Sequence, residues 1–258
     1  MKTAKEILAR SVILLCVSDR CAMEKIYWHP PLSTQQREQQ RLAIWEWLNE
    51  KGYTDYITEK EKDFFLSKLW RGFSSPYVQN FQWQYEAIEP LLWTLGIVEK
   101  RSGYNRYVVT DFRPMLQIKQ DSEDSSVFVN STHIMEEVLD KCELRSEDEI
   151  RLYHKVAMLW CWRATQGKKP IFRKKSAKEI IIEIFGKEYE KPANIILRKS
   201  GEDNDFVVNN KSVSKLSYNE VARLCLIAKW RYHALEWMMV DKEWDKVKFK
   251  MTYLQFKS

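Results

Sequence analysis

Three arginines fall on helix faces that are otherwise apolar, and a buried guanidinium is a group that can do chemistry. At about 100° per residue, Arg231 projects into the apolar arc that contains Leu235, and Arg163 projects beside Leu159. Arg10 lies on the apolar face of the first predicted helix. A buried arginine needs a carboxylate or several carbonyl oxygens, because an unpaired charge away from water costs several kcal/mol.

Two interpretations of these arginines stay open. In the first, which we prefer, they are structural: each is paired inside the core or reaches the surface from a helix end. In the second, Arg10, Arg163 and Arg231 are ligand-binding residues of a cationic pocket for an anionic group. For Arg231 we expect a carboxylate or carbonyl partner from another helix, with Asp19 and Glu24 as candidates, and His233 on the opposite, exposed face.

A basic strip, Lys168 to Lys178 (KKPIFRKKSAK), has six Lys or Arg in eleven residues. A strip of this kind could contact phosphates; the candidate nucleic-acid contacts are Lys168, Lys169, Arg173, Lys174 and Lys175. The net charge of the chain is only +6, and no aromatic stacking platform accompanies the strip in the sequence. We therefore prefer a solvated loop, with weak nucleic-acid binding as an alternative and not as the expected partner.

Motifs of catalysis and metal binding are missing from the sequence. We find no GxxxxGK[ST], GxGxxG, HExxH or GxSxG. The four histidines are far apart, and the five cysteines have wide spacings without a CxxC. We assign no catalytic residue, no metal and no cofactor, and leave open whether the protein is an enzyme. The cysteine pattern predicts free thiols in the cytoplasm.

The apolar run from Ser11 to Val17 is too short to span a bilayer and is followed by Asp19 and Arg20. We expect a buried first helix over 3–24 and no membrane association.

The elements that must position these residues are mostly helices. Only 7 Gly and 7 Pro are present, which favours helix over a turn-rich β fold. Capping-box patterns begin at Thr58 and Ser217. We expect helices over 3–24, 34–50, 134–143, 146–166, 176–186 and 217–239, among others, and strands or extended segments over 106–110, 126–130, 194–198 and 205–208.

The predicted fold class is mainly α: a single multi-helix domain over 1–258, with about eight helices and one or two small β-hairpins. Possible lobes cover 1–100 and 134–258, joined by an irregular or β segment.

One short pattern occurs twice, as WQYEAIE at 83–89 and WRYHALE at 230–236. Both copies project a broad apolar arc, so we expect both to be central helices. Pro90 should bend only the first copy, because it removes the hydrogen bond to the carbonyl of Glu86. Shared packing geometry explains this repeated pattern better than gene duplication does.

A set of motifs extends along most of the chain: LARSVILL, WQYEAIEPLLWTLG, MLWCWRA, NDFVVNNKSVSKLSYNE, KWRYHALEWM and WDKV, in this order. The set resembles the bacterial domain-of-unknown-function family 4272. Two departures are Glu236, where the family usually has Asn, and Lys246-Val247-Lys248 in place of an acidic tail. The resemblance implies a mostly helical bacterial protein and brings no activity and no catalytic residues.

The function is not determined by these observations. Our leading hypothesis is a non-enzymatic cytoplasmic interaction or accessory protein of the immunity type, with a protein partner and an open oligomeric state. The alternatives are an enzyme or small-molecule receptor that uses the buried arginines, and weak nucleic-acid binding through 168–178.

Overall fold

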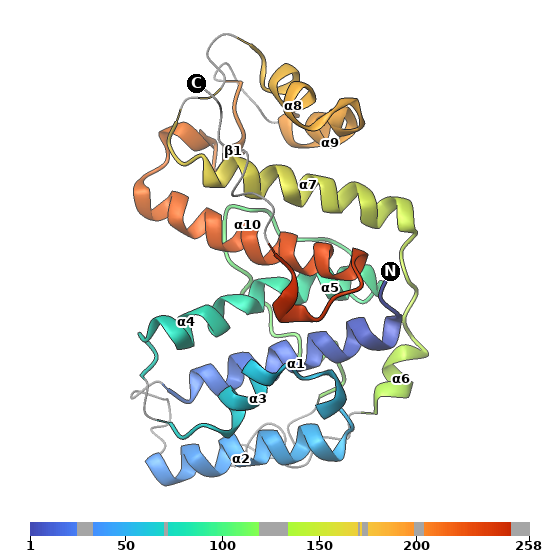
Figure 1. The fold of residues 1–258 in the computed structure, drawn as a ribbon, viewed down its shortest axis with the longest axis vertical. Helices are drawn as coiled ribbons and strands as arrows, with labels where there is room; N and C mark the ends of the chain where they lie inside the picture. Colours follow the sequence, from blue (N-terminus) through green and yellow to red (C-terminus); the bar gives the residue numbers. More distant parts are fainter. Residues whose placement is uncertain are drawn as a thin grey trace. The chain divides into compact units, whose positions relative to one another are not determined.

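The computed structural model describes residues 1–24, 33–69, 72–118, 134–169, 171, 175–198 and 204–248. They form a mainly α protein (Figure 1), which confirms the predicted fold class. The α-helices are α1 (Ala4–Ala22), α2 (Thr34–Glu50), α3 (Glu59–Leu66), α4 (Pro76–Gln82), α5 (Ile88–Thr94), α6 (Met135–Leu139), α7 (Glu147–Thr165), α8 (Ala177–Phe185), α9 (Glu190–Leu197) and α10 (Tyr218–Met239).

Short 3₁₀ helices and one small hairpin complete the described elements. The 3₁₀ helices are η1 (Thr54–Tyr56), η2 (Trp83–Ala87), η3 (Lys187–Tyr189), η4 (Val213–Lys215) and η5 (Trp244–Lys246). Strands β1 (Val207–Val208) and β2 (Lys211–Ser212) pair antiparallel, with Val207 opposite Ser212. The positive φ angles of Asn209 and Asn210 close this hairpin.

The described residues group into two compact units. The first contains 1–101, 108–144 and 237–247, and the second contains 102–107, 145–236 and 248. The predicted lobes over 1–100 and 134–258, and the single domain over 1–258, stay predictions.

Helix α1 is the centre of the first unit. Every residue from Ile7 to Val17 is buried, so this helix is covered on all sides, as expected for a buried first helix. A capping box between Thr3 and Glu6 fixes its start. Helices α2 to α6 pack around it. Because residues 7–17 of α1 are inside the unit, any polar side chain among them must find its partners within the protein.

Several sequence predictions need correction. Residues 194–198 were predicted as extended but belong largely to α9, because packing against α7 and α8 outweighs the β propensity of their isoleucines. Residues 106–110 form no strand, and 126–130 lie outside the described residues. The strand within 205–208 is confirmed by β1, and the capping boxes at Thr58 and Ser217 are confirmed by their hydrogen bonds.

The two copies of the repeated pattern differ in conformation. The second is part of α10, whereas residues 83–87 of the first form the 3₁₀ helix η2 between α4 and α5. Pro90 explains the difference: its ring would clash with the carbonyl of Glu86 in a continuous α-helix.

The predicted exposed face of the last helix is wrong. Every residue from Trp230 to Met238 is buried, including His233 at 4% exposure. The imidazole of His233 packs edge-on against the indole of Trp230. The helical projection was correct for Arg231, which is 3% exposed, but a projection cannot show that the polar face is covered as well.

Candidate functional site

Arg10 is buried in the first unit and has carboxylate and carbonyl partners. Its Nη1 donates to both carboxylate oxygens of Glu61, at 2.6 and 2.8 Å, and its Nη2 donates to the carbonyl of Tyr56. The guanidinium also lies 5.2 Å from the ring centroid of Trp244 and 5.9 Å from that of Trp237. The charge of Arg10 is therefore balanced within the protein.

Glu61 belongs to the capping box that starts α3. Its Oε2 accepts the backbone N–H of Thr58 at 2.9 Å, and the side chain is fully buried. At the other end of α3, Arg41 Nη1 donates to the carbonyl of Phe65 at 2.7 Å and Arg20 Nη2 donates to that of Ser67 at 3.1 Å. Arginines from α1 and α2 thus satisfy polar groups at both ends of α3.

Arg163 is fully buried in the second unit and forms a bidentate pair with Asp205, with both N···O distances at 2.7 Å. Its Nη1 also donates to the carbonyl of Gly167, just after α7. Asp205 accepts in addition the backbone N–H groups of Phe206 and Ser214. This carboxylate therefore ties the end of α7 to both sides of the hairpin.

Arg231 donates to backbone carbonyls of a loop in the same unit. Its Nη1 reaches the carbonyls of Ser102 and Gly103 at 2.9 and 3.0 Å, and its Nη2 reaches that of Arg106 at 3.4 Å. The guanidinium lies 5.1 Å from the ring centroid of Tyr104, which stacks on Trp160. The carbonyl partners come from a loop and not, as expected, from another helix.

Substitution of Arg231 should destabilise the second unit. We expect Arg231→Ala to lower the free energy of unfolding by about 2–4 kcal/mol, because several carbonyls lose their donor. Arg223→Ala, at an exposed position of the same helix, should change it by less than about 0.5 kcal/mol. Chemical denaturation of both variants measures the difference, and equal midpoints would contradict a structural role for Arg231.

The three arginines do not share one described set of contacts. Arg10 belongs to the first unit, and Arg163 and Arg231 to the second, each with its own partners. Their role as ligand-binding residues stays a prediction. The geometry gives all three a structural task.

Two hollows in the first unit flank η1. The larger has a volume of about 700 Å³ and is lined by Lys2, Arg10, Asp55, Tyr56, Ile57, Thr58, Glu59, Trp237, Asp241, Lys242, Glu243, Trp244 and Lys246. Four of these side chains are cationic and four are anionic. The two indoles are almost fully buried, so they form its inner wall and not an open aromatic cage.

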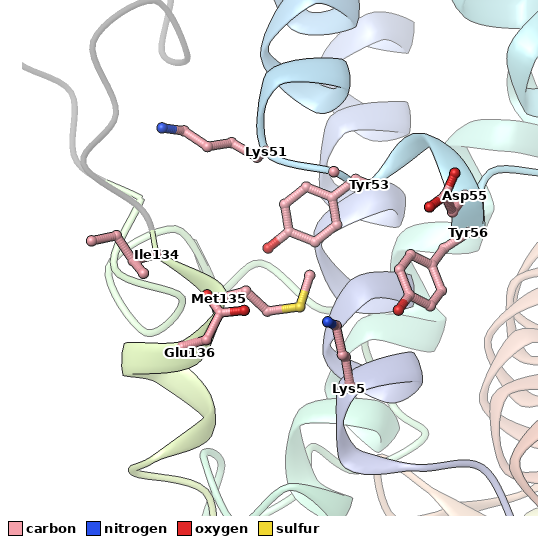
Figure 2. Close-up of a pocket in the computed structure, with 9 residues that line it drawn as sticks. Lys5, Lys51, Tyr53, Asp55, Tyr56, Ile134, Met135 and Glu136 are labelled. Atoms are coloured by element: carbon pink, nitrogen blue, oxygen red, sulfur yellow. The ribbon is translucent and has the colours of Figure 1, made fainter.

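The smaller hollow has a volume of about 280 Å³ and also contains Asp55 and Tyr56. Figure 2 shows the side chain of Met135 extending from α6 toward Tyr53 and Lys5. Tyr53 is buried and stacks on Trp47 at 5.7 Å, and burial raises the pKa of its phenol. A phenol with a raised pKa keeps its proton at neutral pH, so Tyr53 is not a base here.

A partly buried ion pair connects α1 to the segment after residue 110. Asp19 bonds to Arg113, which also donates to Asp111 at 3.1 Å. Burial raises the pKa of Asp19 to about 6 although Arg113 opposes the shift. The two carboxylates considered for Arg231 therefore have other partners, because Glu24 bonds to Arg20 at 3.0 Å.

The raised pKa of Asp19 predicts a pH dependence of stability. Between its ordinary pKa of 3.8 and about 6, the folded state binds this proton more tightly than the unfolded state does. The contribution is therefore complete below 3.8 and is lost as the pH rises through 6, by at most about 3 kcal/mol. Denaturation at several pH values should show a smaller decline over this window in Asp19→Asn than in the wild type, and equal slopes would contradict the assignment.

The basic strip is only partly within the described residues, since Arg173 and Lys174 lie outside them. Lys168 and Lys169 are exposed, and Lys175 pairs with Glu183 at 2.6 Å. A role for these residues in nucleic-acid contact stays a prediction.

Thiols and metal ligands offer no reactive centre in the part of the chain that the structure describes. No group of three or more His, Cys, Asp or Glu could hold a metal ion there. The cysteines are free, and burial raises the pKa of Cys161 to about 12 and raises that of Cys16 well above its ordinary value. Neither thiol is activated as a nucleophile.

Sequence reasoning found the three arginines but missed their partners Glu61 and Asp205. Glu61 was visible as the last residue of the capping box that begins at Thr58, and Asp205 as the acidic residue of the NDFVV segment. Nothing in the sequence connects either one to a particular arginine, because 51 and 42 residues separate the pairs.

The described chain is thus a mainly α protein whose buried arginines hold helix ends and a hairpin, and whose first unit has two hollows of mixed charge. None of its described helices is long and apolar enough for a membrane span. The family model described as Domain of unknown function (DUF4272) matches residues 1–169, and the chain belongs to this family. No curated protein and no solved structure matches the chain.

Proposed function

We propose that this is a non-enzymatic binding protein whose partner is another protein, bound at the larger hollow beside η1. The observation that carries the proposal is the lining of that hollow, which has equal numbers of cationic and anionic side chains around Tyr56. Pockets for small molecules are mostly apolar with few polar groups. Charges of both signs instead suit a polypeptide with complementary charges, which they would orient and select.

The proposed setting is the cytoplasm, where an accessory protein of the immunity type would meet its partner. Five free cysteines support a reducing compartment, because thiols of an oxidising compartment are usually paired. The buried arginines do not supply a catalytic group in this proposal, since their charges are used inside the protein.

A photo-crosslinking amino acid at Lys242 tests the proposal in native cells. Lys242 is exposed and lines the larger hollow, whereas Lys60 is exposed in the same unit and lines neither hollow. We expect a discrete crosslinked polypeptide from position 242, competed by unmodified protein and reduced by Tyr56→Ala. The same products from position 60, or none from position 242, would reject the hollow as a binding surface.

An anionic ligand at Arg10 is a second candidate. Arg10 lines the larger hollow, and its buried Nε has no hydrogen-bond partner among the described residues. Glu61 neutralises the guanidinium through both carboxylate oxygens, which is why we rank this candidate second. Thermal denaturation with phosphate and citrate tests this candidate. An anion bound at the hollow should raise the melting temperature of the wild type and of the control Lys60→Gln. The double variant Lys2→Gln with Lys242→Gln should lose that rise.

A further inference from the structure

An exposed aromatic ring lies beside the first lysines of the basic strip. Tyr218, the first residue of α10, is 81% exposed, the highest value among the large hydrophobic side chains of the described residues. The Nζ of Lys168 lies 4.9 Å from the centroid of its ring. The sequence gives no sign of this arrangement, because Lys168 follows α7 and Tyr218 comes fifty residues later.

The charged group that the structure places against this ring is the ammonium of Lys168. Lys168 and Lys169 are exposed, and neither forms an ion pair with a described residue. The pKa of Glu220 is lowered mainly by its hydrogen bonds with Ser217. The exposed Lys211 and Arg223 lie close enough to Glu220 to lower its pKa as well.

Other lysines of the strip are already engaged. Lys175 pairs with Glu183 at 2.6 Å and Lys178 pairs with Glu190 at 2.7 Å. Among the described lysines of the strip, those without an acidic partner are thus Lys168, which lies over the ring of Tyr218, and Lys169, which follows it in the sequence.

We infer that Tyr218, Lys168 and Lys169 form a contact site for single-stranded nucleic acid. An exposed tyrosine can stack on any unpaired base, since every base has a π face, and nearby lysines attract the phosphates. A duplex would use the ring poorly because its bases are already stacked on one another. The site lies in the second unit and is independent of the proposed protein-binding hollow.

Fluorescence anisotropy with a labelled oligothymidylate and a duplex of equal length tests the inference with the whole chain. We expect the wild type to prefer the single strand. Tyr218→Ala should weaken this binding roughly 5- to 160-fold, the range of one stacked base, and Tyr218→Phe should retain it. Lys168→Gln with Lys169→Gln should reduce the slope of log affinity against log salt by about 1.4, at about 0.7 for each phosphate contact.

The matched control is Lys175→Gln with Lys178→Gln, which removes the same charge from paired lysines of the same strip. Binding should change much less in this variant. Equal losses in both double variants, unchanged binding by Tyr218→Ala, or no binding by the wild type at low salt would overturn the inference. Equal binding of polyglutamate would also overturn it, since that result identifies a general polyanion surface.

Discussion

Arg163→Ala is expected to lower the free energy of unfolding by about 3–5 kcal/mol. The substitution removes the two guanidinium donors from the buried carboxylate of Asp205 and leaves that charge uncompensated at 3% exposure. It also removes the donor to the carbonyl of Gly167 after α7. The two backbone N–H groups that Asp205 accepts cannot replace the lost charge.

The matched control for this prediction is Arg151→Ala, on the same helix. Arg151 is exposed and pairs with Glu147 one turn away, so its removal should cost less than about 0.5 kcal/mol. Asp205→Ala and the double variant complete a cycle. We expect the double variant to cost much less than the sum of the single losses, because the second substitution removes a group already without its partner. Additive losses in urea denaturation would mean that the pair is not the cause.

Arg10→Ala should have an effect of similar size in the first unit, about 3–5 kcal/mol. The carboxylate of Glu61 is fully buried and would keep only the backbone N–H of Thr58, at the start of α3. The backbone amides of α3 should then exchange hydrogen much faster, because the capping residue Glu61 becomes a buried charge without its cationic partner and destabilises the start of the helix.

Two variants separate the charge from the packing of Arg10. Lys5→Ala, at an exposed position of α1, should leave both stability and exchange nearly unchanged. Arg10→Met combined with Glu61→Met replaces the pair by apolar side chains of similar length and should recover most of the loss, as apolar replacements of buried ion pairs often do. If the combined variant is as unstable as Arg10→Ala, shape and not charge is what matters at this position.

The sequence predicted features that depend on neighbouring residues. The capping boxes at Thr58 and Ser217 and the hairpin strand were within reach because each is set by a few adjacent residues. The burial of Arg231 followed from one helix projection.

The features that the sequence could not predict depend on contacts between segments that are distant in the chain. The burial of His233, the helical state of 194–198 and the carboxylate partners of Arg10 and Arg163 were missed for this reason. The exposed Tyr218 beside Lys168 is another case, since no spacing rule relates two residues at the ends of different helices.

The attachment of α3 at both ends has a kinetic consequence. A helix of 8 residues is too short to persist alone in water, since isolated helices below about 12–15 residues are marginal. The groups that complete it, Arg10, Arg20 and Arg41, reside on α1 and α2. During folding α3 should therefore become ordered only after those two helices have met. A variant that weakens its ends should accelerate unfolding while refolding keeps its rate.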